Sequence, residues 1–269
     1  MAAAGRRRSR SRLPDGVSLA WRRGGRCRAA AALGVFLAAG SAGAAEAAGL
    51  PGLGVRESRV VVDGDAKPWG AVVRVQVPGV SRCTGFLVGP QTAVTAAHCL
   101  YGRRLGHFAP PSSVHVLLGY ANGDYAQHVV ASSFQVGDGY APSSPAGQGT
   151  DVAVITLAKA VGGPGDILAL ADGPVPRGAR LMAGGFSQDR AERLQADVSC
   201  IALGYRAGPA GPVLVHDCAG TRGTSGGPVL MQAPGEAWRV AGVQVAGNAD
   251  DAGGVAVPAS AIRSLLARP

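Results

Sequence analysis

The stretch Gly220-Thr221-Arg222-Gly223-Thr224-Ser225-Gly226-Gly227-Pro228 places one serine among four glycines. A glycine-rich backbone can turn sharply and present its N–H groups to a bound atom. Two upstream segments are equally distinctive: Thr95-Ala96-Ala97-His98-Cys99 sets a histidine beside a cysteine, and Gly149-Thr150-Asp151-Val152-Ala153-Val154-Ile155 opens an apolar run with an aspartate. The three segments supply a serine, a histidine and an aspartate, each in its own local setting.

These three residue types suit nucleophilic catalysis. A serine hydroxyl barely ionises near neutral pH, so Ser225 needs a base to take its proton as it attacks. The imidazole of His98 can do this, because its ordinary pKa lies near neutrality. A buried carboxylate, here Asp151, would fix the imidazole tautomer and stabilise the imidazolium. The negative charge that develops on an attacked carbonyl needs fixed donors, and the backbone N–H groups of Gly223 and Ser225 are the candidates.

The motifs resemble a known family. The segments TAAHC (95–99), DVAVITL (151–157) and GTSGGP (223–228) are similar, in the same order, to the three signatures of the chymotrypsin/trypsin-like serine endopeptidases. The resemblance continues in Arg59–Gly64 with Pro68-Trp69 at the start of the catalytic domain, in Cys83–Val88, and in Gly242–Gly247 along the substrate cleft. It covers roughly residues 57–267 and implies peptide-bond hydrolysis through an acyl-enzyme.

The same resemblance implies an all-β fold of two six-stranded antiparallel barrels, with the active site between them and a short C-terminal helix. The residues agree, because short apolar or alternating runs recur between turns supplied by 42 glycines and 18 prolines. We expect strands in these runs: 71–77, 83–88, 114–118, 128–134, 152–157, 180–182, 197–202, 213–216, 228–231, 239–245 and 254–257. We expect a helix from Pro258 to Ala267, with Ile262, Leu265 and Leu266 on its buried face.

Two departures from the family pattern affect the predicted site. Thr224 stands where the trypsin branch has an aspartate that pairs with an N-terminal amine released by activation cleavage. An uncharged threonine cannot form that pair, so we expect no such zymogen switch. The sequence Val245-Ala246-Gly247 replaces the usual Ser-Trp-Gly. Val245 cannot donate a side-chain hydrogen bond to Asp151, and Ala246 removes a large wall of the cleft.

The resemblance also locates a substrate-binding pocket. No aspartate occupies the floor position, which we assign to Ala219, so a preference for Arg or Lys is not supported. Gln244 and Thr221 would contact a small or polar substrate side chain. His216 lies nine residues before Ser225, and we expect it to be structural. The predicted pocket consists of Ala219, Gly220, Thr221, Gln244, Val245 and Gly247.

The N-terminus is typical of a targeting segment. An arginine-rich start precedes the apolar run 29–39, and Ala42-Gly43-Ala44 fits a small-x-small cleavage site. The apolar run is short for a membrane span of about 20 residues, although a retained signal anchor is the alternative. We therefore predict a signal peptide over 1–44, a short pro-segment or N-terminal extension over 45–59, and the trypsin-like domain over 60–269. No stable membrane span is expected after cleavage.

Charge argues against a nucleic-acid partner. The chain is formally +9, but residues 1–28 carry nine arginines and one acid. The remainder holds 17 basic and 16 acidic residues, a net charge of about +1. We expect protein or peptide substrates, no nucleic acid, no cofactor, no metal and a monomer.

Cysteine usage is typical of an exported protein. Cys27 would leave with the signal peptide, and four cysteines allow three pairings. The family resemblance favours Cys83–Cys99, which leaves Cys200–Cys218. Free thiols and a zinc site are the alternatives, but no CxxC pair supports zinc. Oxidised pairs predict a secreted or periplasmic protein.

A second function class stays open at the level of sequence. The chain could be a catalytically silent exported binding protein on the same fold. Val245 and Ala246 are its only support, whereas His98, Asp151 and Ser225 are all present.

Overall fold

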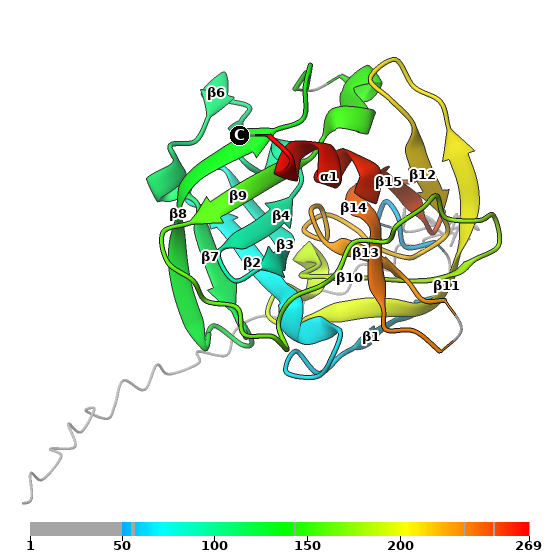
Figure 1. The fold of residues 1–269 in the computed structure, drawn as a ribbon, viewed down its shortest axis with the longest axis horizontal. Helices are drawn as coiled ribbons and strands as arrows, with labels where there is room; N and C mark the ends of the chain where they lie inside the picture. The colour runs from blue at the N-terminus through cyan, green and yellow to red at the C-terminus, as the bar shows by residue number, and fades with distance from the viewer. Residues whose placement is uncertain (1–49, 55–56, 143, 234, 250, 269) are drawn as a thin grey trace, which may run out of the picture. The chain divides into compact units, whose positions relative to one another are not determined.

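The computed structural model describes residues 50–54, 57–142, 144–233, 235–249 and 251–268. The predicted signal peptide lies outside these residues. The described chain is dominated by strands, which form two closed antiparallel barrels followed by one α-helix (Figure 1). The predicted fold class is therefore confirmed. Among the described residues, no helix has the length and apolar character needed to cross a membrane.

The first barrel closes in the order β2-β3-β4-β9-β8-β7. In β2, every position except Gln76 is buried. Phe86, Leu87 and Ile155 are fully buried. The strands are β2 (Val72–Val77), β3 (Ser81–Gly89), β4 (Thr92–Thr95), β7 (His115–Leu118), β8 (Gln127–Val136) and β9 (Ala153–Leu157).

The second barrel closes in the order β11-β10-β13-β14-β15-β12, because β12 pairs back onto β11. Leu181 and Leu214 are fully buried in one cluster with Val229 and Ala256. A short strand, β1 (Arg59–Val61), pairs antiparallel with the first three residues of β11. The six barrel strands are β10 (Arg180–Gly185), β11 (Gln195–Arg206), β12 (Val213–His216), β13 (Pro228–Met231), β14 (Arg239–Gly247) and β15 (Gly254–Pro258).

Minor elements complete the chain. The two-stranded pair β5 (Tyr101–Gly102) and β6 (His107–Phe108) follows the histidine segment. Helical turns of the 3-10 type are η1 (Trp69–Ala71), η2 (Ala97–Cys99), η3 (Pro111–Ser113), η4 (Pro145–Thr150) and η5 (Gln188–Arg190). The described part of the chain has one α-helix, α1 (Ala259–Leu266), which packs against β9 of the first barrel and β14 and β15 of the second.

The structure corrects some local expectations. No strand was predicted at β1 or β4, and β4 is only four residues long, which gives too little periodicity to recognise. β11 extends past the predicted 197–202, because a register shift near Gly204 lets the strand continue. In α1, Ile262 and Leu265 are buried as expected, but Leu266 is 41% exposed. Leu266 lies one position beyond Leu265 and so turns away from the core.

The connection from β9 to β10 runs between the two barrels. Residues between β9 and β10 touch both barrels, since Leu168 N–H donates to the Leu87 carbonyl and Ala171 N–H to the Val240 carbonyl.

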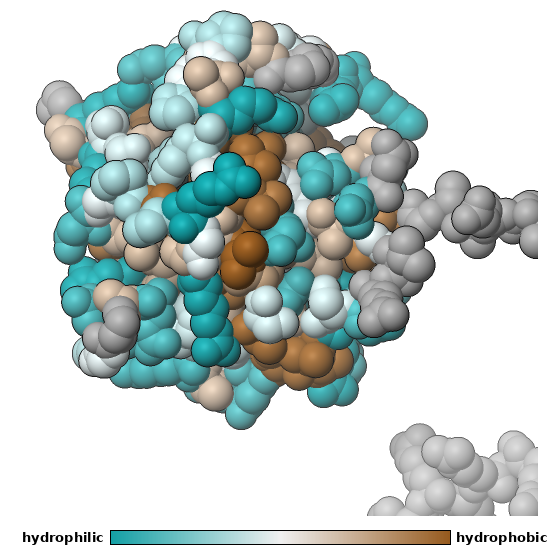
Figure 2. Space-filling model, turned by 90° about the vertical axis from the view of Figure 1, so that its right-hand side faces the viewer, coloured by the Kyte–Doolittle hydropathy of each residue, from teal (hydrophilic) through white to brown (hydrophobic). Residues whose placement is uncertain are grey.

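Figure 2 shows the face on the side of β11 and β12, where brown apolar atoms lie among teal polar ones. Exposed apolar side chains of β1 and β11 include Val60, Val61, Ile201, Leu203 and Tyr205.

Candidate active site

His98 and Asp151 meet on the first barrel. His98 lies in η2, directly after β4, and Asp151 lies between η4 and β9. The side chain of Asp151 makes two hydrogen bonds to His98: Oδ1 accepts from the backbone N–H at 2.9 Å, and Oδ2 lies 2.7 Å from the ring Nδ1. Asp151 is buried, with 8% of its surface exposed. A carboxylate in this position holds the proton on Nδ1 and leaves Nε2 free to accept one.

Ser225 lies in the turn before β13. Its carbonyl accepts from Thr84 N–H at 2.9 Å, which joins the turn to β3 of the first barrel. The next residue, Gly226, has φ +83°, and a Cβ there would lie 2.2 Å from the Thr84 carbonyl oxygen. A side chain at 226 would therefore push the serine turn away from the first barrel.

His98, Gly223 and Ser225 line one cavity of about 990 Å³. None of the hydrogen bonds among the described residues joins the Ser225 hydroxyl to His98. Catalytic hydrogen bonds are often long in the free enzyme and shorten when substrate binds. The three residues thus share a space that a substrate could enter.

Two disulfides brace the loops around this cavity. Cys83–Cys99 joins β3 to the turn that carries His98. Cys200–Cys218 joins β11 to the segment that leads toward Ser225. Each closes a loop of fewer than twenty residues, so each limits the freedom of the unfolded chain by about 3 kcal/mol in the chain-entropy account.

The predicted specificity residues lie on two neighbouring segments of the second barrel. Ala219, Gly220 and Thr221 follow β12, and Gln244, Val245 and Gly247 belong to β14. The Thr221 hydroxyl is buried and has no hydrogen-bond partner among the described residues. Gly220 and Gly247 both lie next to Gly52 of the N-terminal segment.

His216 is a buried structural residue. Its Nε2 lies 2.6 Å from Gln244 Oε1, and its Nδ1 accepts from Cys218 N–H at 3.2 Å. Burial lowers the pKa of His216 to about 4, although the Gln244 hydrogen bond opposes this shift. His216 is therefore neutral at pH 7. It holds the side chain of Gln244 in place, and Gln244 also donates to the Ala246 carbonyl.

Sequence reasoning missed Thr84, which fixes the loop before Ser225. The Thr84 hydroxyl donates to the Gly223 carbonyl at 2.8 Å and accepts from Phe186 N–H at 2.9 Å. A threonine after Cys83 in a strand gives no local signal for this role. The contact joins positions 139 residues apart, so only the tertiary fold reveals it.

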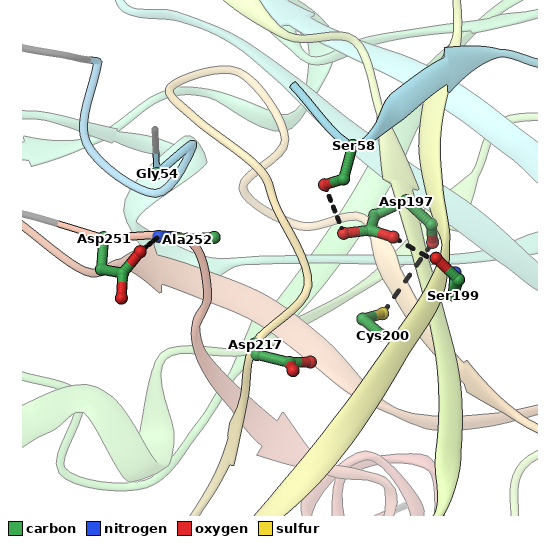
Figure 3. Close-up of a pocket in the computed structure, with 8 residues that line it drawn as sticks. All are labelled: Gly54, Ser58, Asp197, Ser199, Cys200, Asp217, Asp251 and Ala252. Atoms are coloured by element: carbon green, nitrogen blue, oxygen red, sulfur yellow. Dashed lines mark hydrogen bonds between the residues drawn. The ribbon is translucent and has the colours of Figure 1, made fainter. Parts of the chain in front are cut away.

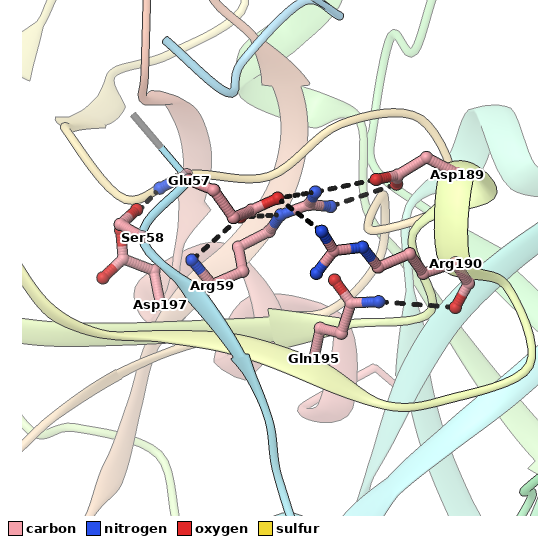
Figure 4. Close-up of polar contacts among 8 residues, drawn as sticks. Glu57, Ser58, Arg59, Asp189, Arg190, Gln195 and Asp197 are labelled. Carbon is pink, nitrogen blue, oxygen red and sulfur yellow. Dashed lines mark hydrogen bonds and ion pairs between the residues drawn. The ribbon is translucent and has the colours of Figure 1, made fainter. Parts of the chain in front are cut away.

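Sequence reasoning also missed the ion cluster around Arg59 (Figure 4). The guanidinium, with 1% of the side chain exposed, lies 2.7 Å from both Glu57 Oε2 and Asp189 Oδ2. Hydrogen bonds from Arg59 lower the pKa of the Glu57 and Asp189 carboxyls, against the raising effect of their partial burial. Asp189 belongs to η5, where Gln188 N–H donates to the Arg222 carbonyl, next to Gly223.

Comparisons with known proteins follow the same outline. A glutamyl endopeptidase of Bacillus licheniformis is 37% identical over 54 residues, which is 20% of this chain and 17% of that protein. A solved Glu endopeptidase superposes with a TM-score of 0.60 at 18% identity, covering 78% of this chain and 96% of that one. The VesB protease of Vibrio cholerae gives 0.59 at 20% identity, covering 77% and 65%. At these identities the solved structures establish the fold. The model of the trypsin family matches residues 60–266, nearly all of the described chain, and the chain therefore belongs to that family.

Proposed function

We propose that the chain is a serine endopeptidase, with Ser225 as nucleophile, His98 as general base and Asp151 as the orienting carboxylate. The observation that carries this proposal is the pair of hydrogen bonds from Asp151 to His98, beside a cavity that His98 shares with Ser225 and Gly223. A structural histidine would not need its ring and its backbone held by the same carboxylate at the edge of a cleft.

The reaction follows the template of this family. As the Ser225 oxygen bonds to the substrate carbonyl carbon, its proton moves to Nε2 of His98. The carbonyl oxygen takes up the electron pair and is held by the backbone N–H groups of Gly223 and Ser225. The C–N bond then breaks, and the proton on Nε2 goes to the leaving amine. Water hydrolyses the resulting ester by the same steps and restores the hydroxyl.

The buried hydroxyl of Thr221 supports a small or polar substrate side chain. An unpartnered buried hydroxyl is costly, so a polar ligand that reached it would gain a hydrogen bond. Nothing acidic replaces Ala219 at the pocket floor. A cleavage profile from a peptide library, dominated by Lys or Arg before the cut, would contradict this preference.

We propose the same chain organisation as the sequence predicts: a signal peptide over 1–44, a pro-segment or N-terminal extension over 45–59, and the catalytic domain over 60–269. Two disulfides within the described residues support an oxidising compartment, either secreted or periplasmic. Mass spectrometry of the exported protein would locate the new N-terminus. A monomer stays a prediction that light scattering can check.

Fluorophosphonate labelling tests the proposed function. The oxidised protein should be labelled, and Ser225→Ala should not, because the reagent reports an activated serine. Ser132→Ala is the matched control, since Ser132 is an exposed serine on β8, and it should label normally. Absence of labelling in a folded wild-type sample would favour the catalytically silent binding protein instead.

A further inference from the structure

The cavity beside Ser225 is lined by four arginines and by no acidic side chain. It extends from the serine turn to the β2–β3 turn and the Cys83–Cys99 disulfide, where its lining includes Gly79 and Cys83. The arginines are Arg74, Arg82, Arg103 and Arg222. Such a concave site with charges of one sign concentrates electrostatic potential on its contents.

One of these arginines is already balanced. Arg74 is buried, donates to the Ala191 carbonyl, lies over the Tyr120 ring and approaches Glu192 at 3.9 Å. Arg82, Arg103 and Arg222 are exposed and have no ion-pair partner within the described ranges. Three cations therefore face this side of the cleft without compensation.

The position of this cavity indicates which part of a substrate it would contact. This inference rests on the proposed function. In the proposed function, the acyl part of a substrate would lie along Gln244–Gly247, with its carbonyl at Gly223 and Ser225. The residues after the scissile bond must then leave on the other side of Ser225, which is the arginine-lined cavity. We propose that the enzyme prefers substrates with acidic side chains after the scissile bond.

Matched peptides test this preference. Substrates that differ only by Glu, Gln or Lys after the scissile bond should differ in kcat/KM, with Glu about tenfold above Gln at low salt and the gap shrinking in about 1 M NaCl. Arg82→Gln should reduce the Glu:Gln ratio, whereas Arg180→Gln, an exposed arginine outside the cavity, should not. Equal cleavage of Glu and Gln peptides would overturn the preference. Loss of fluorophosphonate labelling would instead contradict the proposed function itself.

Residues 50–54 lie against the predicted specificity pocket. The Gly52 carbonyl accepts from Gly220 N–H at 2.9 Å, and Gly52 forms a parallel bridge with Ala252. Gly52 has φ +84°, and a Cβ there would lie 2.1 Å from the Gly220 carbonyl oxygen and 3.3 Å from Gly247 Cα. Only a glycine fits between these two walls.

The residues after Gly52 are attached to the second barrel by contacts of their own. Gly54 and Ala252 border a pocket that Ser58, Asp197, Asp217 and Asp251 also line (Figure 3). Ser58 donates to Asp197 at 2.8 Å, and Arg59 is held by its ion cluster. Displacement of residues 50–54 would therefore leave the attachment at 58–61 in place.

We infer that residues 50–54 block the specificity pocket, so that the chain carrying them in this position is latent toward peptides. This too rests on the proposed function. The Gly220 N–H and the space beside Gly247 are unavailable to a substrate, while the Ser225 cavity stays open. Small reagents should then react with Ser225 even when peptides are not cleaved.

A full-length variant separates peptide cleavage from the reaction of Ser225 with small reagents. Gly52→Val should expel the segment and raise kcat/KM for peptides about tenfold or more, with little change in labelling by an alkyl fluorophosphonate. Gly178→Val is the matched control, because Gly178 has φ +80° but no atom within 4 Å of its Cβ position. Unchanged peptide cleavage in a Gly52→Val protein that still labels would overturn the inference.

Hydrogen exchange on the wild-type chain gives a second readout that requires no variant. A peptidyl phosphonate that fills the pocket should speed exchange of the backbone N–H groups of Gly52, Leu53 and Gly54, because it competes for Gly220 and Gly247. An alkyl fluorophosphonate should not. Equal protection with both reagents would show that the segment does not occupy the pocket. Failure of the alkyl fluorophosphonate to bond to Ser225 would count against the proposed function.

Discussion

The two halves of the candidate site are held in different ways. On the first barrel, one side chain, Asp151, holds His98 by two hydrogen bonds. On the second barrel, Ser225 is held through its backbone, by Thr84 N–H and by the tight fit of Gly226. The first half therefore depends on a chemical group that mutation can remove without moving the chain. The second depends on backbone geometry, which tolerates almost no added atom.

The largest expected effect comes from Asp151→Asn. An amide of the same shape keeps the packing but favours the wrong tautomer of His98, and the family template gives a loss of about 10⁴-fold in kcat. The melting temperature should change little. Asp138→Asn is the control, because Asp138 is an exposed aspartate paired with Arg268. Retained activity in Asp151→Asn would mean that Asp151 does not orient His98.

Gly226→Ala should lower the stability of the protein as well as its activity. The added methyl meets the Thr84 carbonyl at a positive φ, so we expect a loss of about 3 kcal/mol or more in the free energy of unfolding, together with loss of activity. Gly79→Ala is the control, since Gly79 has φ +72° and no atom within 4 Å. Denaturant unfolding followed by fluorescence measures both. Equal stability of the two variants would contradict the tight fit.

These two halves also differ in how far sequence alone reaches. The three motifs predicted the fold and the family, because His98, Asp151 and Ser225 each lie in a short recognisable segment. The contacts of Thr84 with Gly223 and of Arg59 with Asp189 span more than a hundred residues. No local period or spacing encodes such contacts. The position of Gly52 against Gly220 was unpredictable for the same reason.

His216 makes the stability of the second barrel depend on pH. Its pKa in the folded protein, about 4, lies below the ordinary value of 6.5, so the unfolded chain takes up a proton first as the pH falls. The stabilisation is complete above pH 6.5 and is lost as the pH falls toward 4, by roughly 3 kcal/mol in total. Unfolding at several pH values should show this slope, and His216→Gln should remove it. An unchanged slope in the variant would assign the titration elsewhere.

The smallest expected effect concerns the Arg59 cluster, which braces the serine loop from outside. The pKa values of Glu57 and Asp189 are lowered in the folded protein, so their contribution is complete above their ordinary values of 4.5 and 3.8 and is lost as the pH falls below them. Both carboxylates are partly exposed, so we expect Arg59→Gln to cost about 1–2 kcal/mol at pH 7 and almost nothing near pH 2. A cost that does not change with pH would show that Arg59 acts through packing. The half of the site that carries Ser225 would then need no charged side chain to hold it, in contrast to the half that carries His98.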